Sequence, residues 1–184
     1  PVGQDSEIWA HNFEHGLSRQ LTSNSTNDAY PRIYGDFVVW QGRDPGGDWE
    51  IYLYRFSTDH ISRLTDNTFD DTQAQIHGYQ VVWLSQDTVR GLDIVYVYNV
   101  LTATLRSVAS DPGEIVHPHT DGLWIVWQIR SSLDPGADFE IQYWDGFTVH
   151  TLTNNNYDDI FPEISERQIV WESEEAGDSE IFHY

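Results

Sequence analysis

Acidic loops built around glycine are the segments of this sequence best suited to chemistry. The segment DPGGDWE at residues 44–50 returns as DPGADFE at residues 134–140, and a looser copy, EAGDSE, spans residues 175–180. Several carboxylate oxygens around a glycine turn suit a hard cation such as Ca²⁺. The candidate ligands are the loop aspartates Asp44, Asp48, Asp134, Asp138 and Asp178. The spacing differs from the twelve-residue Ca²⁺ loop, and the same residue types build solvated turns without any metal, which is the more common case.

A pair of histidines forms a second candidate site. His117 and His119 flank a proline at the start of a predicted strand, where alternation places both imidazoles on one side. Such a pair can ligate a transition metal if other repeats supply the remaining ligands. The positions equivalent to His119 in the other repeats hold Arg32, Gln75 and Glu163. Because this set is mixed, structural or solvated histidines are the more frequent explanation.

Three aspartates share one position in the repeats described below. Asp28, Asp71 and Asp159 each lie seven residues after the leucine of a Leu-Thr pair, and Ile115 takes this place in the remaining unit. If the aspartates point toward a central axis, they form a negative channel mouth that attracts cations or basic side chains. The alternative is a turn in which each aspartate side chain bonds to nearby backbone at the start of a strand.

The elements that must position these residues repeat about every 44 residues. The triplet Val38-Val39-Trp40 returns at residues 81–83, 125–127 and 169–171, in steps of 43, 44 and 44. The Leu-Thr pair keeps the same steps, in weakened form at residues 108–109. In the second unit, short runs rich in Val, Ile, Tyr and Trp predict strands at 30–34, 37–41, 49–56 and 61–65. Glycine within 34–36 and 77–79 predicts tight turns.

Four antiparallel strands in each repeat are typical of a β-propeller blade. We therefore predict an all-β fold, a β-propeller of four-stranded antiparallel blades with about four repeats and incomplete blades at both termini. The chain reads as one domain, residues 1–184, with units at 1–22 (partial), 23–65, 66–109, 110–153 and 154–184 (partial). The strand count leaves three options open: part of a longer propeller, a four-blade ring with a displaced strand, or a homo-oligomeric ring.

The repeat resembles the TolB-like (PD40, WD40-like) propeller family. The resemblance rests on NDAYP at residues 27–31, the Val-Val-Trp strand, DWEIY at 48–52 and RLT at 63–65, and it covers essentially the whole chain. The chain departs from the family where short turns such as Tyr34-Gly35-Asp36 replace the usual Ser-Pro-Asp-Gly. This shorter version is similar to repeats of secreted and cell-surface proteins. The resemblance implies a periplasmic or extracellular location and protein-interaction roles, but no single activity.

Composition narrows the possible partners. Thirty Asp and Glu stand against nine basic residues, all arginine, giving a net charge of −21, with no cysteine. Nucleic acids and anionic membranes both need clustered basic residues, so neither is expected as a partner. No apolar stretch approaches the 18 or so residues of a membrane span. A protein with a basic surface, a metal ion or a glycan remains compatible with this charge.

These observations favour a non-catalytic binding module, secreted or surface-borne, whose acidic face or channel mouth binds a protein partner. The alternative is a propeller that binds a metal ion such as Ca²⁺, or a glycan. A carbohydrate-active enzyme comes third, because a catalytic carboxylate pair is easily hidden among thirty acids. The sequence contains no Gly-rich phosphate loop, no Gly-x-Ser-x-Gly and no His-Glu-x-x-His.

Overall fold

The computed structural model describes residues 5–132, 136–175 and 178–184, and its strands form five antiparallel sheets in chain order. We call these sheets blades 1 to 5. Blade 1 contains β1 (Trp9–Asn12) and β2 (Leu17–Gln20); blade 2 contains β3 (Asp28–Tyr34), β4 (Phe37–Arg43), β5 (Trp49–Arg55) and β6 (His60–Arg63). Blade 3 contains β7 (Asp70–His77), β8 (Gln80–Asp87), β9 (Leu92–Asn99) and β10 (Thr104–Asp111). Blade 4 contains β11 (Glu114–Thr120), β12 (Ile125–Arg130), β13 (Glu140–Trp144) and β14 (Val149–Thr151); blade 5 contains β15 (Asp159–Ser165), β16 (Gln168–Ser173) and β17 (Glu180–His183).

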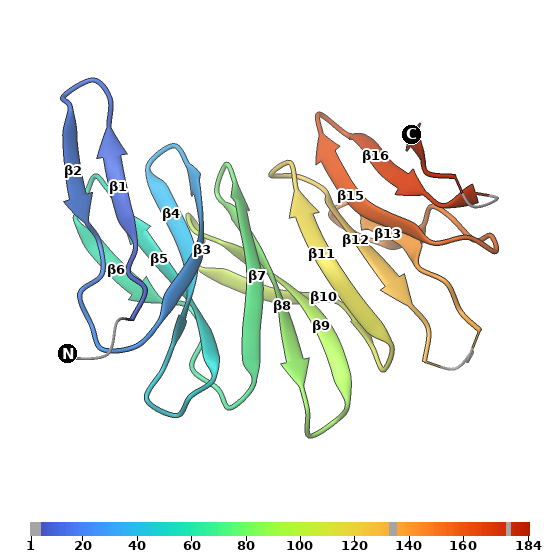
Figure 1. Ribbon diagram of the computed structural model, residues 1–184, viewed down its shortest axis with the longest axis horizontal. Helices are drawn as coiled ribbons and strands as arrows, with labels where there is room; N and C mark the ends of the chain where they lie inside the picture. Colours follow the sequence, from blue (N-terminus) through green and yellow to red (C-terminus); the bar gives the residue numbers. More distant parts are fainter. Residues whose placement is uncertain (1–4, 133–135, 176–177) are drawn as a thin grey trace.

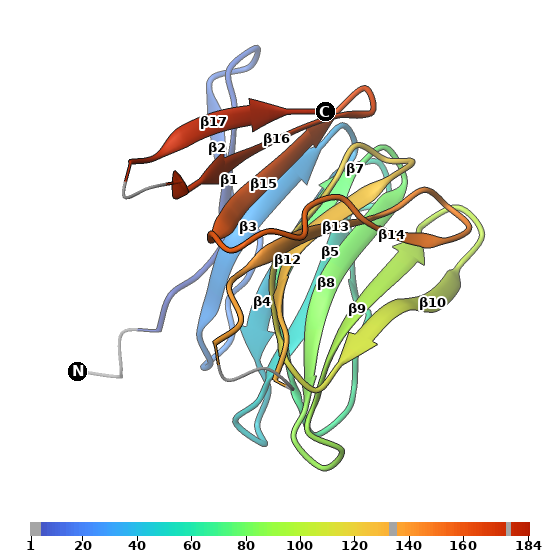
Figure 2. The same cartoon turned by 90° about the vertical axis from the view of Figure 1, so that its right-hand side faces the viewer.

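The blades lie side by side, with β1–β2 and β15–β17 at opposite ends of the row (Figure 1). Viewed from the β15–β17 end, the sheets stand one behind another (Figure 2). Each strand pairs with the strand before or after it in sequence, which is the meander of a propeller blade. The predicted all-β fold of repeated four-stranded antiparallel blades is therefore confirmed. Among the described residues, no helix is long and apolar enough to cross a membrane.

The Val-Val-Trp strand explains why the blades stack. Its consecutive apolar residues face both sides of the sheet, so each blade has two apolar faces that pack against neighbouring blades. Val39 of blade 2 packs with Ile76 of blade 3, and Val82 of blade 3 packs with Ile115 of blade 4; both valines are fully buried. Val170, the equivalent residue in blade 5, is 39% exposed because no further described blade covers it.

The Leu-Thr motif ends the fourth strand. The Thr65 hydroxyl accepts the backbone N–H of Ile51 at 2.8 Å. It takes the place of the backbone carbonyl that would accept this N–H if the pairing of β6 with β5 continued. Thr22 and Thr153 do the same for Ile8 and Ile141. In blade 3 the threonine is replaced by Ala109, and β10 continues its pairing with β9 as far as Asp111. The weakened motif therefore produces a longer strand.

A bulge in each first strand shapes the side of the molecule where these strands meet. One residue in each of β3, β7, β11 and β15 has a positive φ, and the strand register shifts there. These residues are Tyr30 (54°), Gln73 (57°), His117 (55°) and Phe161 (52°). A bulge inserts one residue and bends the strand, so simple alternation of side chains fails at this point. The predicted tight turns are also present, with Gly35 and Gly78 at positive φ.

Candidate functional site

The three register-sharing aspartates are buried inside the blades. Asp28, Asp71 and Asp159 are 3%, 1% and 1% exposed. Asp71 Oδ1 accepts the indole N–H of Trp83 at 3.1 Å, and its Oδ2 accepts the side-chain N–H of Asn67 at 2.5 Å. The same bonds join Asp28 and Asp159 to Trp40, Asn24, Trp171 and Asn155. The expected acidic channel mouth is therefore wrong for these residues, because each carboxylate is occupied in holding a buried tryptophan and a loop asparagine.

Asp71 and Asp159 belong to chains of hydrogen bonds, here called relays, that cross from one blade to the next. Glu50 of β5 accepts the backbone N–H of Asn67 at 2.9 Å, Asn67 bonds to Asp71, and Asp71 bonds to Trp83 of β8. The relay thus ties blade 2 to blade 3. An equivalent relay runs from Glu140 through Asn155 and Asp159 to Trp171, and ties blade 4 to blade 5.

The junction between blades 3 and 4 has no such relay in the described structure. Ile94 replaces the glutamate, Asp111 replaces the asparagine and Ile115 replaces the aspartate. Ile115 instead packs with apolar residues of both blades, including Val95. Trp127 therefore buries its indole N–H without a hydrogen-bond partner among the described residues.

Buried carboxylate oxygens without hydrogen-bond partners occur in pairs at the start of the third strand of the repeat, which corresponds to β1 in the two-stranded blade 1. Within the described residues they are Asp5 Oδ2 with Glu7 Oε2, Asp48 Oδ2 with Glu50 Oε2, and Asp138 Oδ2 with Glu140 Oε2. The pairs occupy equivalent positions in blades 1, 2 and 4 and have the pattern Asp-x-Glu. Blade 3 has Leu92 and Ile94 at these positions. Asp178 and Glu180 of blade 5 are exposed.

In blade 2 a third carboxylate joins the pair. One ligand atom each from Asp44, Asp48 and Glu50, together the blade 2 carboxylate cluster, lies within 4.8 Å of the others. The Glu50 side chain is completely buried. Asp44 Oδ1 accepts the backbone N–H of Gly47 at 2.9 Å, which fixes the loop. The guanidinium of Arg63 lies 2.8 Å from Glu50 Oε1 and 3.2 Å from Asp44 Oδ2, leaving Glu50 Oε2 free.

The electrostatics of this cluster favour a bound cation in addition to the Arg63 guanidinium. Desolvation raises the pKa of Asp48, and the charge of Asp44, a side-chain hydrogen bond to Asp44 and the charge of Glu50 add to the rise in that order. Like charges at this separation repel, and a bound metal ion removes that repulsion. Arg63 supplies only part of the compensation, because it leaves the Asp48 Oδ2 and Glu50 Oε2 pair untouched. The sequence pointed to Asp44 and Asp48 but missed the glutamates, although the recurring Glu-Ile pair marks their position.

The remaining predicted metal ligands fall into three groups. Asp138 lies in the equivalent pair of blade 4 with Glu140. Asp178 is exposed, and its Oδ1 accepts the backbone N–H of Ser179 at 3.1 Å, which is ordinary turn geometry. Asp134 lies outside the described residues.

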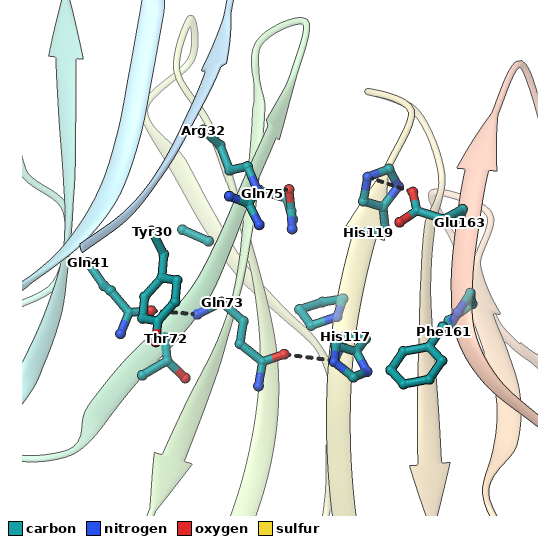
Figure 3. Close-up of a pocket in the computed structure, with 13 residues that line it drawn as sticks. Tyr30, Arg32, Gln41, Thr72, Gln73, Gln75, His117, His119, Phe161 and Glu163 are labelled. Atoms are coloured by element: carbon teal, nitrogen blue, oxygen red, sulfur yellow. Dashed lines mark hydrogen bonds and ion pairs between the residues drawn. The ribbon is translucent and has the colours of Figure 1, made fainter. Parts of the chain in front are cut away.

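Both predicted histidines reach a cleft between the first strands of blades 2 to 5 (Figure 3). The hydrogen-bond partners of each imidazole determine its tautomer. His119 Nδ1 accepts the backbone N–H of Ile164 at 3.5 Å, so the proton is on Nε2, 3.1 Å from Glu163 Oε2. His117 Nδ1 donates to Gln128 Oε1 at 3.1 Å, and that oxygen also accepts the backbone N–H of Phe161. Only His117 Nε2 is then free for a metal.

The histidine pair consequently does not form a metal centre by itself. Within the described ranges, the only group of three metal-ligating side chains whose ligand atoms lie close together is the blade 2 carboxylate cluster. Burial lowers the pKa of His119 and outweighs the opposing effect of the Glu163 charge, so this imidazole is neutral at pH 7. Its role is to hold Glu163 at the wall of the cleft.

Comparison with known proteins identifies the fold of this chain but no family or function. No family model and no curated protein matches the sequence significantly. TolB from Acinetobacter baumannii has a similar structure, with a TM-score of 0.62 and 20% identity over 96% of this chain and 45% of that one. An oligogalacturonate lyase in complex with manganese gives 0.69 and 15% identity over 96% and 53%. Dipeptidyl peptidase 4 from Porphyromonas gingivalis gives 0.70 and 8% identity over 98% and 35%.

The chain spans about half of the TolB and lyase structures and about a third of the peptidase. The lyase and the peptidase are named for different activities, so the similarity concerns the fold. Taken with the repeat, the blade topology and the interblade packing, the comparison shows that this chain has the fold of the TolB-like β-propeller domains.

Proposed function

We propose that this chain is a binding module whose blades take up divalent cations, Ca²⁺ above all, at the start of their third strands. The observation that carries the proposal is the set of three Asp-x-Glu pairs, each with two buried oxygens that lack a partner within the described structure. A buried carboxylate oxygen without a donor costs free energy, and a cation offsets that cost. The pattern disappears where blade 3 carries Leu92 and Ile94.

The ligand chemistry supports Ca²⁺ over a transition metal. All side-chain ligands in the blade 2 cluster are carboxylates, with no imidazole or thiolate among them. Ca²⁺ accepts six to eight oxygens at about 2.3–2.6 Å in flexible geometry, which puts neighbouring ligands within about 5 Å of each other. The spacing within the cluster, at most 4.8 Å, meets this requirement. Mg²⁺ needs a stricter octahedron and binds less readily to a site made mainly of protein carboxylates.

The position of the pairs gives the cation a structural role. Glu50 and Glu140 each belong both to a pair and to an interblade relay. A cation on these residues therefore stiffens the junction between neighbouring blades. We further propose that the protein works outside the cytoplasm, on the cell surface or in the periplasm. Extracellular Ca²⁺ modules typically bind with a Kd of about 0.1–1 mM, so they are occupied where the Ca²⁺ concentration is near millimolar. A protein partner with a basic surface remains part of this proposal, supported by the net charge of −21.

The test is thermal unfolding with calcium added back to EGTA-treated protein. Saturating Ca²⁺ is expected to raise the melting temperature by about 3 °C or more, since ligand at ten to a hundred times its Kd contributes roughly 1.4–2.7 kcal/mol per site. Mg²⁺ at the same concentration serves as the ionic-strength control and is expected to give a smaller rise. Equal shifts with the two ions, or no shift with either, would overturn the proposal.

A further inference from the structure

The cleft between the first strands is a second candidate site, separate from the carboxylate pairs. Its volume is about 430 Å³, and it lies among β3, β7, β11 and β15. Its lining forms two layers, one at the bulge and one two residues further along each strand. The bulge layer is Tyr30, Gln73, His117 and Phe161; the second layer is Arg32, Gln75, His119 and Glu163. Figure 3 shows these side chains converging on the same space.

Arg32 is the cationic side chain among the residues that line this cleft. Five of the nine arginines form ion pairs with carboxylates in the described part of the chain, and Arg32 is one of the four that do not. Arg32 instead has neutral partners: its Nε donates to Gln75 Oε1 at 3.1 Å and its Nη1 to the carbonyl of Pro31 at 3.1 Å. In a protein with thirty acidic residues, a cation left without a described carboxylate partner and placed in a cleft is suited to an anionic ligand.

The opposite wall offers a hydrogen-bond acceptor. His119 Nε2 holds Glu163 Oε2, and no hydrogen bond to Glu163 Oε1 occurs among the described residues. The Glu163 side chain is 64% exposed, so a ligand can reach it. A carboxylate held by a neutral imidazole accepts a hydrogen bond from a ligand hydroxyl. Arg32 and Glu163 thus give the cleft opposite charges on two walls.

The bulge layer adds aromatic faces and neutral polar groups. Tyr30 and Phe161 are 65% and 53% exposed and line the cleft. His117 keeps a free Nε2 acceptor, because its Nδ1 donates to Gln128. Gln73 accepts the backbone N–H of His117 with its oxygen at 2.8 Å and retains its amide N–H groups as donors. Aromatic faces beside amide and imidazole groups are suited to a hydroxylated ring.

We propose that this cleft binds a small hydroxylated carboxylate, the chemistry of a sugar acid. Its carboxylate pairs with Arg32, a hydroxyl donates to Glu163, and the ring lies against Tyr30 or Phe161. This site does not depend on the calcium sites, because none of its residues belongs to an Asp-x-Glu pair.

The experiment is isothermal titration of the protein with glucuronate, with glucose as the uncharged match and hexanoate as a monocarboxylate without a ring or hydroxyl groups. A Kd on the order of 1 mM is expected for glucuronate, as for a ligand of this size. Arg32→Gln is expected to weaken binding at least about tenfold. Arg106→Gln, which removes the same charge from an exposed site on β10, is expected to leave it unchanged.

Asp48→Asn keeps the cleft intact and tests whether a bound calcium ion carries the ligand. Unchanged glucuronate binding by this variant, together with the loss in Arg32→Gln, supports the proposal. Glucose binding as tight as glucuronate overturns the role of Arg32. Hexanoate binding as tight as glucuronate overturns the sugar chemistry. Equal loss in the Arg32 and Arg106 variants, or no glucuronate binding at all, overturns the site.

Discussion

Trp127 buries its indole N–H beside Ile115, where the tryptophans of blades 2, 3 and 5 each meet an aspartate. One substitution in the repeat has therefore replaced a buried hydrogen bond with an apolar contact. The Trp–Asp hydrogen bond and the Trp127–Ile115 contact occupy equivalent positions in different blades of one molecule. Variants of one arrangement therefore serve as controls for variants of the other.

Tryptophan-to-phenylalanine variants measure the value of the Trp83–Asp71 hydrogen bond. Trp83→Phe removes the indole donor and leaves the buried Asp71 Oδ1 without it. Trp127→Phe removes a donor that has no described acceptor. We expect the free energy of unfolding, measured in urea, to fall by about 1–2 kcal/mol more for Trp83→Phe than for Trp127→Phe. Equal losses would show that the aspartate contributes nothing through the indole.

Valine-to-alanine variants test the stacking of the blades. Val39 is fully buried between blades 2 and 3, whereas the equivalent Val170 is 39% exposed. Val39→Ala is expected to lower the free energy of unfolding by about 2 kcal/mol, and Val170→Ala by less than about 1 kcal/mol. The measurement is urea denaturation of both variants. A loss for Val170→Ala as large as that for Val39→Ala would mean that blade 5 has a further neighbour in solution.

Asp145 gives the fold a defined pH response. The backbone N–H of Thr148, then His150 and the backbone N–H of Phe147, lower the pKa of Asp145 to about 2. A carboxyl whose pKa is depressed on folding stabilises the fold above its unfolded pKa, and this contribution disappears as the pH falls through the folded pKa. Asp145→Asn is therefore expected to destabilise the protein at pH 5 and to have a much smaller effect near pH 2.

The measurement for Asp145 is the difference in urea midpoint between the variant and the parent protein at the two pH values. Because the Asp145 side chain is still 28% exposed and solvent screens the interaction, only the direction is predicted. The same difference at pH 5 and near pH 2 would contradict the assigned hydrogen bonds in this turn.

The repeat spacing predicted the blades because interblade packing requires the same apolar triplet in every unit. Val39 and Val82 must each fill the space beside the next blade, and this constraint is visible in the sequence. The burial of Asp71 was not predicted, although the Asp-to-Trp spacing of twelve residues recurs in three blades and is lost only with Ile115. A pattern of spacing alone does not show which way a side chain points.

The cleft and the carboxylate cluster also show that sequence spacing does not determine the direction of a side chain. The sequence predicted Asp44 and Asp48 because a glycine turn places them close together, but Glu50 reaches them through the strand that follows the turn. His117 was placed on the correct side of its strand, yet by simple alternation rather than by the bulge that the structure contains. Its positive φ falls on a non-glycine residue, for which local sequence gives no signal.

Calcium binding to the Asp-x-Glu pairs is tested most directly by calorimetric titration of the calcium-free protein, its Asp48→Asn/Glu50→Gln variant and an Asp66→Asn control. Asp66 lies beside Arg63 but is 85% exposed and outside the cluster. The parent protein and the Asp66→Asn control are expected to bind the same number of calcium ions, and the double variant one fewer. Identical binding by all three proteins would contradict the blade 2 site, and no calcium binding by the parent protein would contradict the whole proposal.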